Sequence, residues 1–379
     1  MEKEFYEEFE DIVVNTLKRN ISSNEDQKKA ISSHANESLF IVAGPGSGKT
    51  TVIVLKILKY IFVDDIAPDE ILATTFTRKA ANELHSRILS WGDQIKNYLL
   101  DNIVEDDPVK EMELMDFIEK KIDLNKINIG TTDSVAEDLL RIHREPGTNQ
   151  PLVIEDFVTK SAMTNILLKD NIYLNENLKE YLKSFTPKEK LEEPSKMAEI
   201  ILNMKNRMYY DQVNFDEIYD KFEEGSGAKL TLNCIKDYED ELKKRNIIDF
   251  PMLEFKFLNK LKNHKLDIFL DNIKIILIDE YQDSYKPIIT RFINFFIAEG
   301  EGPQFGFFGD AWQTIYQTNN ACGAIEHNNL VEIKKGSNFR SAPRIVNLLN
   351  DIRPDLPQQS AIDNFDGEVV VVTCDDFSG

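Results

Sequence analysis

Two short segments of the chain carry residue types that suit phosphate chemistry, and the first is rich in glycine. Residues 43–50 read Ala-Gly-Pro-Gly-Ser-Gly-Lys-Thr, between an apolar run and a helical pattern. In this context the glycines let backbone N–H groups approach phosphate oxygens, while Lys49 reaches the β- and γ-phosphates and Thr50 ligates Mg²⁺. The predicted phosphate-binding residues are Gly44, Gly46, Ser47, Gly48, Lys49 and Thr50.

An acidic pair, Asp279 and Glu280, follows the apolar run at residues 275–278. Asp279 would join Thr50 in holding Mg²⁺, and Glu280 could polarise water as the general base of phosphoanhydride hydrolysis. An exposed acidic strand end is the alternative, but it is disfavoured because both motifs end strands of one predicted sheet. From Lys49 to Asp279 is 279 − 49 = 230 residues, so a helical domain is expected inside the first one.

Five short, largely apolar segments are predicted to be the strands that position these groups. Such strands are typical of a parallel sheet covered on both faces, and a helix expected over 49–62 completes a strand, glycine turn and helix unit. The predicted strands are 38–43, 70–76, 126–130, 274–279 and 304–309.

The remaining segments are predicted to be helical insertions and the opening of a second unit. A strand over 330–334, a helix over 342–352 and a strand over 367–373 are too little to bury a doubly wound core, so this unit is expected to be incomplete at Gly379. The expected division is a split first α/β domain (1–90, 127–135 and 262–325), an acidic helical excursion (91–126), an inserted helical domain (136–261) and the start of a second α/β domain (326–379).

Composition excludes several other classes of protein. The 45 Lys and Arg residues against 66 acids give a net charge of 45 − 66 = −21, which excludes a generally basic nucleic-acid coat, because such coats bind by neutralising phosphates. Three cysteines and five scattered histidines give neither a disulfide framework nor a metal-ligand spacing. No apolar run approaches the roughly 20 residues that a bilayer needs, so a soluble, cytoplasmic chain without a membrane partner is expected.

An ordered series of motifs resembles that of superfamily 1 helicases of the UvrD/Rep/PcrA type. The series is specific because it covers nearly the whole chain in the family's order. It comprises residues 24–27 (Q motif), 43–50 (phosphate-binding loop), 74–84 (motif Ia), 130–134 (motif Ic), 248–250 (the Asp-Phe signature), 279–284 (motif II), 309–316 (motif III) and 338–341 (motif IV). Motifs V and VI have no counterpart before Gly379, so the resemblance implies one RecA-like domain and the start of another, which is the N-terminal motor half.

The resemblance also implies an ATP site with residues outside the loop. Gln27 would read adenine with its amide, Gln313 would contact the γ-phosphate, and Arg340 would act as an arginine finger. Thr51 and Phe339 stand where the family usually has Arg and Tyr around adenine, so weaker stacking is expected. The implied catalytic residues are Lys49, Glu280, Gln313 and Arg340; the implied ATP-binding residues are those of the loop with Gln27, Thr51, Asp279 and Phe339; the substrate is ATP and the cofactor is Mg²⁺, held by Thr50 and Asp279.

For single-stranded DNA the resemblance implies contacts from a second set of residues, to which Arg78 adds positive charge. An aromatic side chain stacked on a base is worth about 1–3 kcal/mol. Asp133 stands where the family commonly has His beside DNA phosphates, and an acid there is expected to repel them. The implied DNA-binding residues are Phe76, Thr77, Arg78, Thr132 and Tyr316.

Two functions of different classes stay open from the sequence. The first is an ATP-dependent DNA helicase or translocase that moves 3′ to 5′ on single-stranded DNA. The second is a helicase-like ATP-binding module that docks a protein partner, such as a nuclease, without processive movement. We expect the chain alone to unwind little, because translocation needs the closure of two motor domains. Stimulation of ATP hydrolysis by single-stranded DNA distinguishes the two functions.

Overall fold

A parallel sheet forms the centre of the structure, a computed structural model that describes residues 2–102, 112, 115–144, 146–187, 191–263, 266–297, 302–315, 321–362 and 365–370. Its strands lie in the order β3-β2-β6-β7-β1-β8, and every neighbouring pair is parallel. The predicted α/β fold with a parallel sheet is therefore confirmed. The strands are β1 (Ser38–Ala43), β2 (Ile71–Thr75), β3 (Asn128–Thr131), β6 (Ile275–Asp279), β7 (Gln304–Gly309) and β8 (Leu330–Lys335).

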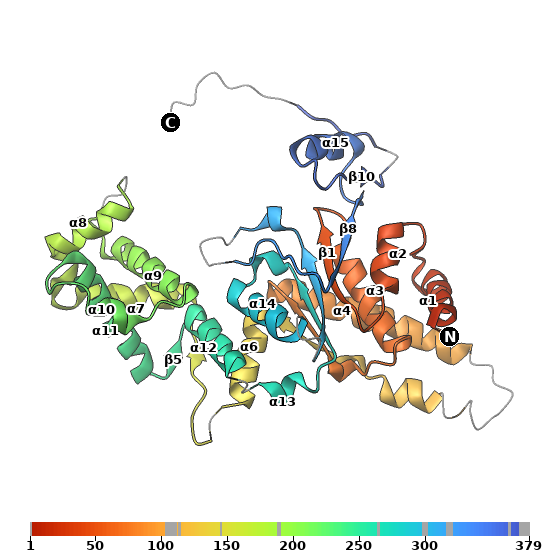
Figure 1. Ribbon diagram of the computed structural model, residues 1–379, viewed down its shortest axis with the longest axis horizontal. Coiled ribbons are helices and arrows are strands. Elements are labelled where there is room, and N and C mark those ends of the chain that lie inside the picture. The colour runs from red at the N-terminus through yellow and green to blue at the C-terminus, as the bar shows by residue number, and fades with distance from the viewer. Residues whose placement is uncertain are drawn as a thin grey trace.

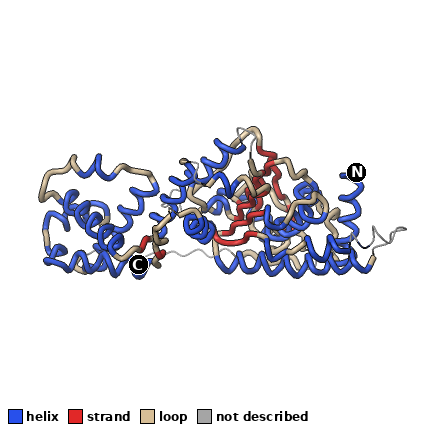
Figure 2. The backbone as a smooth tube through the Cα atoms, turned by 90° about the horizontal axis from the view of Figure 1, so that it is seen from below, coloured by secondary structure: helices blue, strands red, loops and turns tan. Residues whose placement is uncertain are grey.

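Helices cover both faces of this sheet (Figures 1 and 2). In β6, Ile275 and Leu277 pack with the first four helices, while Ile276 and Ile278 pack with the later ones. A strand covered in this way is apolar at every position, which is why its first polar residue is Asp279 at its carboxyl end. One face carries α1 (Glu2–Leu17), α2 (Glu25–Ser32), α3 (Lys49–Phe62) and α4 (Arg78–Asp101); the other carries α6 (Thr132–Ile142), α12 (Phe250–Lys262), α13 (Asp267–Leu270) and α14 (Lys286–Phe292).

The inserted helices lie to one side of the sheet, at the left of Figure 1. An ion pair between the fully buried Lys205 and Asp249 joins two of their segments, and the Tyr238 hydroxyl donates to the same carboxylate at 3.0 Å. These contacts hold α9, α11 and the start of α12 together. The elements of this region are β4 (Leu152–Val153), α7 (Asp156–Leu168), α8 (Glu176–Phe185), α9 (Pro194–Tyr210), α10 (Phe215–Tyr219), α11 (Gly227–Lys244) and β5 (Ile247–Ile248).

The last strand of the sheet corrects one predicted domain boundary. β8 pairs with β1 over its full length, from Ser38 opposite Leu330 to Ala43 opposite Lys335. The expected start of a second domain at residue 326 is therefore wrong for this strand. A local apolar pattern predicts a strand but does not encode which strand it pairs with. Beyond β8 follow β9 (Ser337–Asn338), α15 (Pro343–Ile352) and β10 (Gln359–Ser360), and β9 and β10 form a separate parallel pair.

Two further expectations differ from the structure. The boundary at residue 91 falls inside α4, a single helix that runs to Asp101 and buries Ile95 in the same core as Ile88. Residues 367–370 of the predicted strand over 367–373 are not a strand, and 371–373 lie outside the described residues.

None of the described helices has the length and apolar content that crossing a membrane requires.

Candidate nucleotide and DNA sites

The glycine-rich loop connects β1 to α3 at the carboxyl edge of the sheet. Gly46 and Gly48 have φ angles of +72° and +76°. Residues with a Cβ rarely adopt such positive φ angles. The Ser47 hydroxyl donates to the Gly44 carbonyl at 2.7 Å and closes the turn. Thr50 and Thr51 lie half-buried in the first turn of α3. The backbone thus has the turn, followed by a helix N-terminus, that phosphate groups bind.

Lys49 and Glu280 meet directly, although they are far apart in the sequence. The Lys49 Nζ donates to the Glu280 Oε2 at 2.7 Å. Glu280 adopts a left-handed conformation with φ at +51°, a backbone state that costs about 1–3 kcal/mol outside glycine and tends to occur at functional sites. Beside it, burial and then the Glu280 charge raise the pKa of Asp279 to about 7, against the opposing charge of Lys49.

A series of hydrogen bonds continues from Glu280 to the end of β7. The Gln282 Nε2 donates to the Glu280 Oε2 at 3.0 Å, and the Gln282 Oε1 accepts from the Asp310 backbone N–H at 3.1 Å. Asp310 is fully buried; its Oδ2 accepts from the Gln313 Nε2 at 2.8 Å and also pairs with Arg353. Four predicted site residues, Lys49, Asp279, Glu280 and Gln313, therefore lie in or beside one network.

Gln27 and Phe339 come together over the loop, as expected of residues around a base. A Cβ built on Gly48 would lie 3.5 Å from the Gln27 Nε2 and 3.6 Å from the Phe339 ring. The Asn24 side chain caps α2 by accepting from the Gln27 backbone N–H at 2.9 Å. The Phe339 side chain is 47% exposed, so a face of its ring is available for stacking.

Motif IV packs directly on the loop. The Phe339 N–H donates to the Gly46 carbonyl at 2.8 Å, and the Asn338 Nδ2 donates to the Pro45 carbonyl at 2.9 Å. A Cβ on Gly46 would lie 2.7 Å from the Arg340 Cβ, so glycine is needed for this approach. Arg340 is exposed and lies beside the loop, a position compatible with the arginine finger that the family resemblance implies.

The residues predicted to hold Mg²⁺ fit such an ion. Thr50 and Asp279 offer oxygen atoms, the donors that Mg²⁺ prefers, and Mg²⁺ typically takes only one or two protein carboxylates together with substrate phosphates. Asp279 is a half-buried carboxylate next to a second acid, and the desolvation of its charge and the neighbouring acid both raise its pKa. A cation at this position would relieve that unfavourable electrostatic environment.

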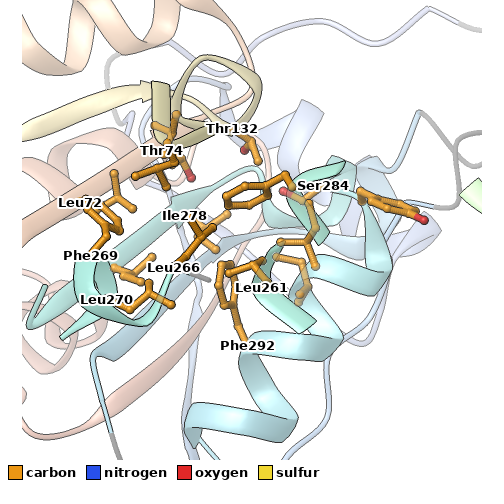
Figure 3. A pocket seen from close by; sticks show the side chains of 17 residues that line it. Leu72, Thr74, Thr132, Leu261, Leu266, Phe269, Leu270, Ile278, Ser284 and Phe292 are labelled. Carbon is orange, nitrogen blue, oxygen red and sulfur yellow. The ribbon is translucent and has the colours of Figure 1, made fainter. Parts of the chain in front are cut away.

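The residues predicted to bind DNA divide into an exposed group and a half-buried one. Phe76, Thr77 and Arg78 are exposed where β2 meets α4, and the Thr77 hydroxyl caps that helix by accepting from Ala80 at 3.1 Å. Thr132 instead lies at an apolar cavity of about 30 Å³ between the sheet and α12–α14, shown in Figure 3. Tyr316 lies outside the described residues.

Asp133, the acid expected to repel DNA, is half-buried at the start of α6. Burial raises its pKa to about 6, while the nearby Arg78 opposes the shift and Glu137 adds to it. Glu254 on α12 has a pKa raised well above its usual value by burial and by Asp133. Asp133 therefore takes up a proton at a higher pH than an exposed aspartate does, although it still carries most of its negative charge at neutral pH.

Three residues of the site are not among the predicted site residues, although Gln282 and Asp310 fall within motifs II and III. Gln282 and Asp310 connect Glu280 to Gln313, and Gln358 lies against Gly44. A detectable signal exists for Asp310, since it is the first polar residue after the apolar strand β7. Gln358 gives no such signal, because its contacts depend on a chain reversal after α15.

Comparison with known proteins is consistent with this geometry. The model of the UvrD/REP helicase N-terminal domain matches residues 23–331. The chain is 29% identical over 339 residues to the ATP-dependent DNA helicase Rep of Buchnera aphidicola subsp. Baizongia pistaciae, covering 86% of this chain and 42% of that protein. It is 26% identical over 337 residues to DNA helicase II of Haemophilus influenzae (87% and 40%) and 26% identical over 362 residues to the ATP-dependent DNA helicase SRS2 of Saccharomyces cerevisiae (86% and 26%).

The chain spans less than half the length of these curated relatives. The family model nevertheless covers most of the chain, from the Q motif through the glycine-rich loop and the acidic pair to β8. The chain belongs to the UvrD/Rep helicase family.

Proposed function

We propose that the chain is the N-terminal motor portion of an ATP-dependent DNA helicase, which couples ATP hydrolysis to 3′-to-5′ movement along single-stranded DNA. The observation that supports this most is the hydrogen-bonded series from Lys49 through Glu280, Gln282 and Asp310 to Gln313. It joins the phosphate-binding loop to the ends of β6 and β7. The names of the relatives, all ATP-dependent DNA helicases or DNA helicase II, agree with it.

The ion pair between Lys49 and Glu280 indicates how binding and hydrolysis are coupled. Phosphate oxygens on the loop are charged acceptors that compete with the Glu280 Oε2 for the Lys49 ammonium. Once Lys49 turns to the phosphates, Glu280 is free to accept a proton from water, while Gln282 still holds it in place. Thr50 and Asp279 would hold Mg²⁺, which would supply charge neutralisation on the transferred phosphoryl group.

The exposed group at the β2–α4 junction would contact the DNA. Phe76 is 41% exposed, and Arg78, two residues later in the chain, is exposed as well. A ring of this kind binds bases without regard to sequence, and a nearby guanidinium attracts the backbone. This limited surface is compatible with a chain of net charge −21, because only the junction needs to be positive.

The test is the rate of ATP hydrolysis with and without an oligo-dT strand. We expect stimulation, and we expect Phe76→Ala to raise the DNA concentration for half-maximal stimulation by about 5- to 150-fold, the equivalent of about 1–3 kcal/mol. Phe157→Ala is the matched control, because Phe157 is an exposed phenylalanine (76%) on α7 in the helical insertion. Stimulation that is equal in both variants would reject Phe76 as a DNA contact.

A second candidate is a nucleotide-gated module that docks a protein partner. It is favoured by the packing of residues 338–340 on the loop. A nucleotide that displaces this segment would also move β9, α15 and β10, which together are called the C-terminal unit (residues 337–360). ATP binding without any stimulation by single-stranded DNA supports this candidate and contradicts the motor.

A further inference from the structure

Gln358 is a buried glutamine that lies against the phosphate-binding loop. It precedes β10, and its side chain is 6% exposed. A Cβ built on Gly44 would lie only 2.8 Å from the Gln358 Nε2. The amide of Gln358 thus takes the space that a side chain at position 44 would need. No motif identified in the sequence includes this residue.

The backbone of Gln358 is held by reciprocal hydrogen bonds. The Asn350 Nδ2 donates to the Gln358 carbonyl at 2.8 Å, and the Gln358 N–H donates to the Asn350 Oδ1 at 2.8 Å. Because Asn350 belongs to α15, the helix fixes the position from which the Gln358 side chain extends. The contact with Gly44 is therefore supported by a folded element.

The orientation of the Gln358 amide follows from its neighbour Asn338. The Asn338 Oδ1 accepts from the backbone N–H groups of Arg340 and Ser341 at 3.0 and 2.8 Å, so the other end of that amide must be the donor. Its Nδ2 donates to the Gln358 Oε1 at 3.1 Å. The Gln358 oxygen therefore faces Asn338, and its Nε2 faces the loop.

The Gln358 Nε2 is buried and has no hydrogen-bond partner among the described residues. A buried donor without an acceptor is unfavourable and calls for a specific explanation. The loop beside it is built to receive phosphate oxygens, which are strong acceptors. An acceptor supplied by a bound nucleotide would satisfy the Nε2, while the Gln358 Oε1 can still accept from Asn338.

We propose that Gln358 is a nucleotide-binding residue that donates its Nε2–H to a phosphate oxygen of the nucleoside triphosphate on the loop. The proposal rests on the proposed ATP site and adds to it a neutral donor from beyond motif IV. It also gives the C-terminal unit a direct contact with the substrate, next to Arg340. Closure of that unit over the loop would then depend on the phosphate chain.

The test uses Gln358→Glu, which keeps an acceptor for Asn338 but replaces the donor that faces the loop with a second carboxylate oxygen. We expect the affinity for Mg-ATP, measured by calorimetry, to fall by about 10- to 100-fold, as expected for one lost hydrogen bond to a charged group. Gln359→Glu is the matched control: it adds the same charge at the next residue, whose side chain is exposed, and should bind Mg-ATP like the wild type.

Gln358→Ala is the second variant, and thermal unfolding checks that both proteins fold. Equal Mg-ATP affinity in the wild type, Gln358→Glu and Gln358→Ala would overturn the role of Gln358. Lys49→Ala then separates the two proposals. If Lys49→Ala loses Mg-ATP binding and both Gln358 variants keep it, the proposed ATP site on the loop stands and Gln358 is not part of it. Absence of Mg-ATP binding by the wild type would overturn the proposed function and this contact with it.

Discussion

Two lysine–carboxylate pairs of this molecule differ in what surrounds them. Lys49 and Glu280 meet at the carboxyl edge of the sheet, where the Glu280 side chain is 35% exposed and the Glu280 Oε2 has one further donor, Gln282. Lys205 and Asp249 are 0% and 4% exposed in the helical insertion. Asp249 also accepts from the Tyr238 hydroxyl and from the Met252 N–H.

The difference separates an exchangeable pair from a fixed one. Breaking a buried pair leaves an uncompensated charge, so the Lys205 pair holds its helices in one arrangement. Burial lowers the pKa of Lys205, and the Asp249 charge opposes that shift. The Lys49 pair is partly solvated, and incoming phosphate can replace Glu280. The two pairs thus differ in burial and in the number of competing donors, which suits the Lys49 pair to the proposed exchange with phosphate and the Lys205 pair to structural order.

The largest expected effect is on turnover at the exchangeable pair. Glu280→Gln removes the proposed general base but keeps an acceptor for Gln282 and Lys49, so we expect the rate of ATP hydrolysis to fall by about 10²- to 10⁴-fold. Mg-ATP affinity should be retained or increase, because Lys49 is no longer held by a full negative charge. Single-turnover hydrolysis and calorimetry measure the two quantities, and a parallel loss of both would place Glu280 in binding alone.

At the fixed pair the expected effect is on folding. Lys205→Ala leaves the Asp249 carboxylate buried without its cation, so we expect the free energy of unfolding to fall by about 3–5 kcal/mol. Denaturant unfolding measures this loss. Under conditions where the variant is folded, its Mg-ATP affinity should equal that of the wild type. A change in affinity with unchanged stability would contradict a structural role for this pair.

A third lysine, Lys335 at the end of β8, sharpens the comparison because its Nζ is buried with no hydrogen-bond partner among the described residues. Burial lowers its pKa to about 8, against the opposing charge of Asp26. The unfolded chain, with a lysine pKa of about 10.4, therefore binds more protons between about pH 8 and 10. Over that range the contribution of Lys335 to stability rises with pH, and below pH 8 its full penalty applies.

Lys335→Met should accordingly stabilise the protein at pH 7 by an amount on the order of 2–3 kcal/mol. The gain should shrink as the pH rises from 8 to 10, because the wild-type lysine loses its charge there. Thermal unfolding of both proteins across this range is the measurement. A pH-independent difference between them would show that lost packing, and not the buried charge, determines the effect.

The parallel sheet was predicted well from the sequence, and the residues expected at the ATP site lie close together, for a physical reason. Short apolar runs that end in Gly46–Gly48 or Asp279 mark the carboxyl ends of buried parallel strands, where ligands bind. The direct contact between Lys49 and Glu280 was not predicted, because spacing identifies the groups but not their partners. The pairing of β8 with β1 and the position of Gln358 depend on tertiary packing, which no local pattern encodes.

The glycine-rich loop is proposed to bind a nucleoside triphosphate through Lys49. The most direct measurement is a calorimetric titration of the wild type and Lys49→Ala with Mg-ATP, with thermal unfolding as the check on folding. We predict saturable binding by the wild type and an affinity lower by about 100-fold or more in Lys49→Ala, since a charge-assisted contact to phosphate is lost. Equal Mg-ATP affinity in two equally folded proteins would contradict the assignment of the loop.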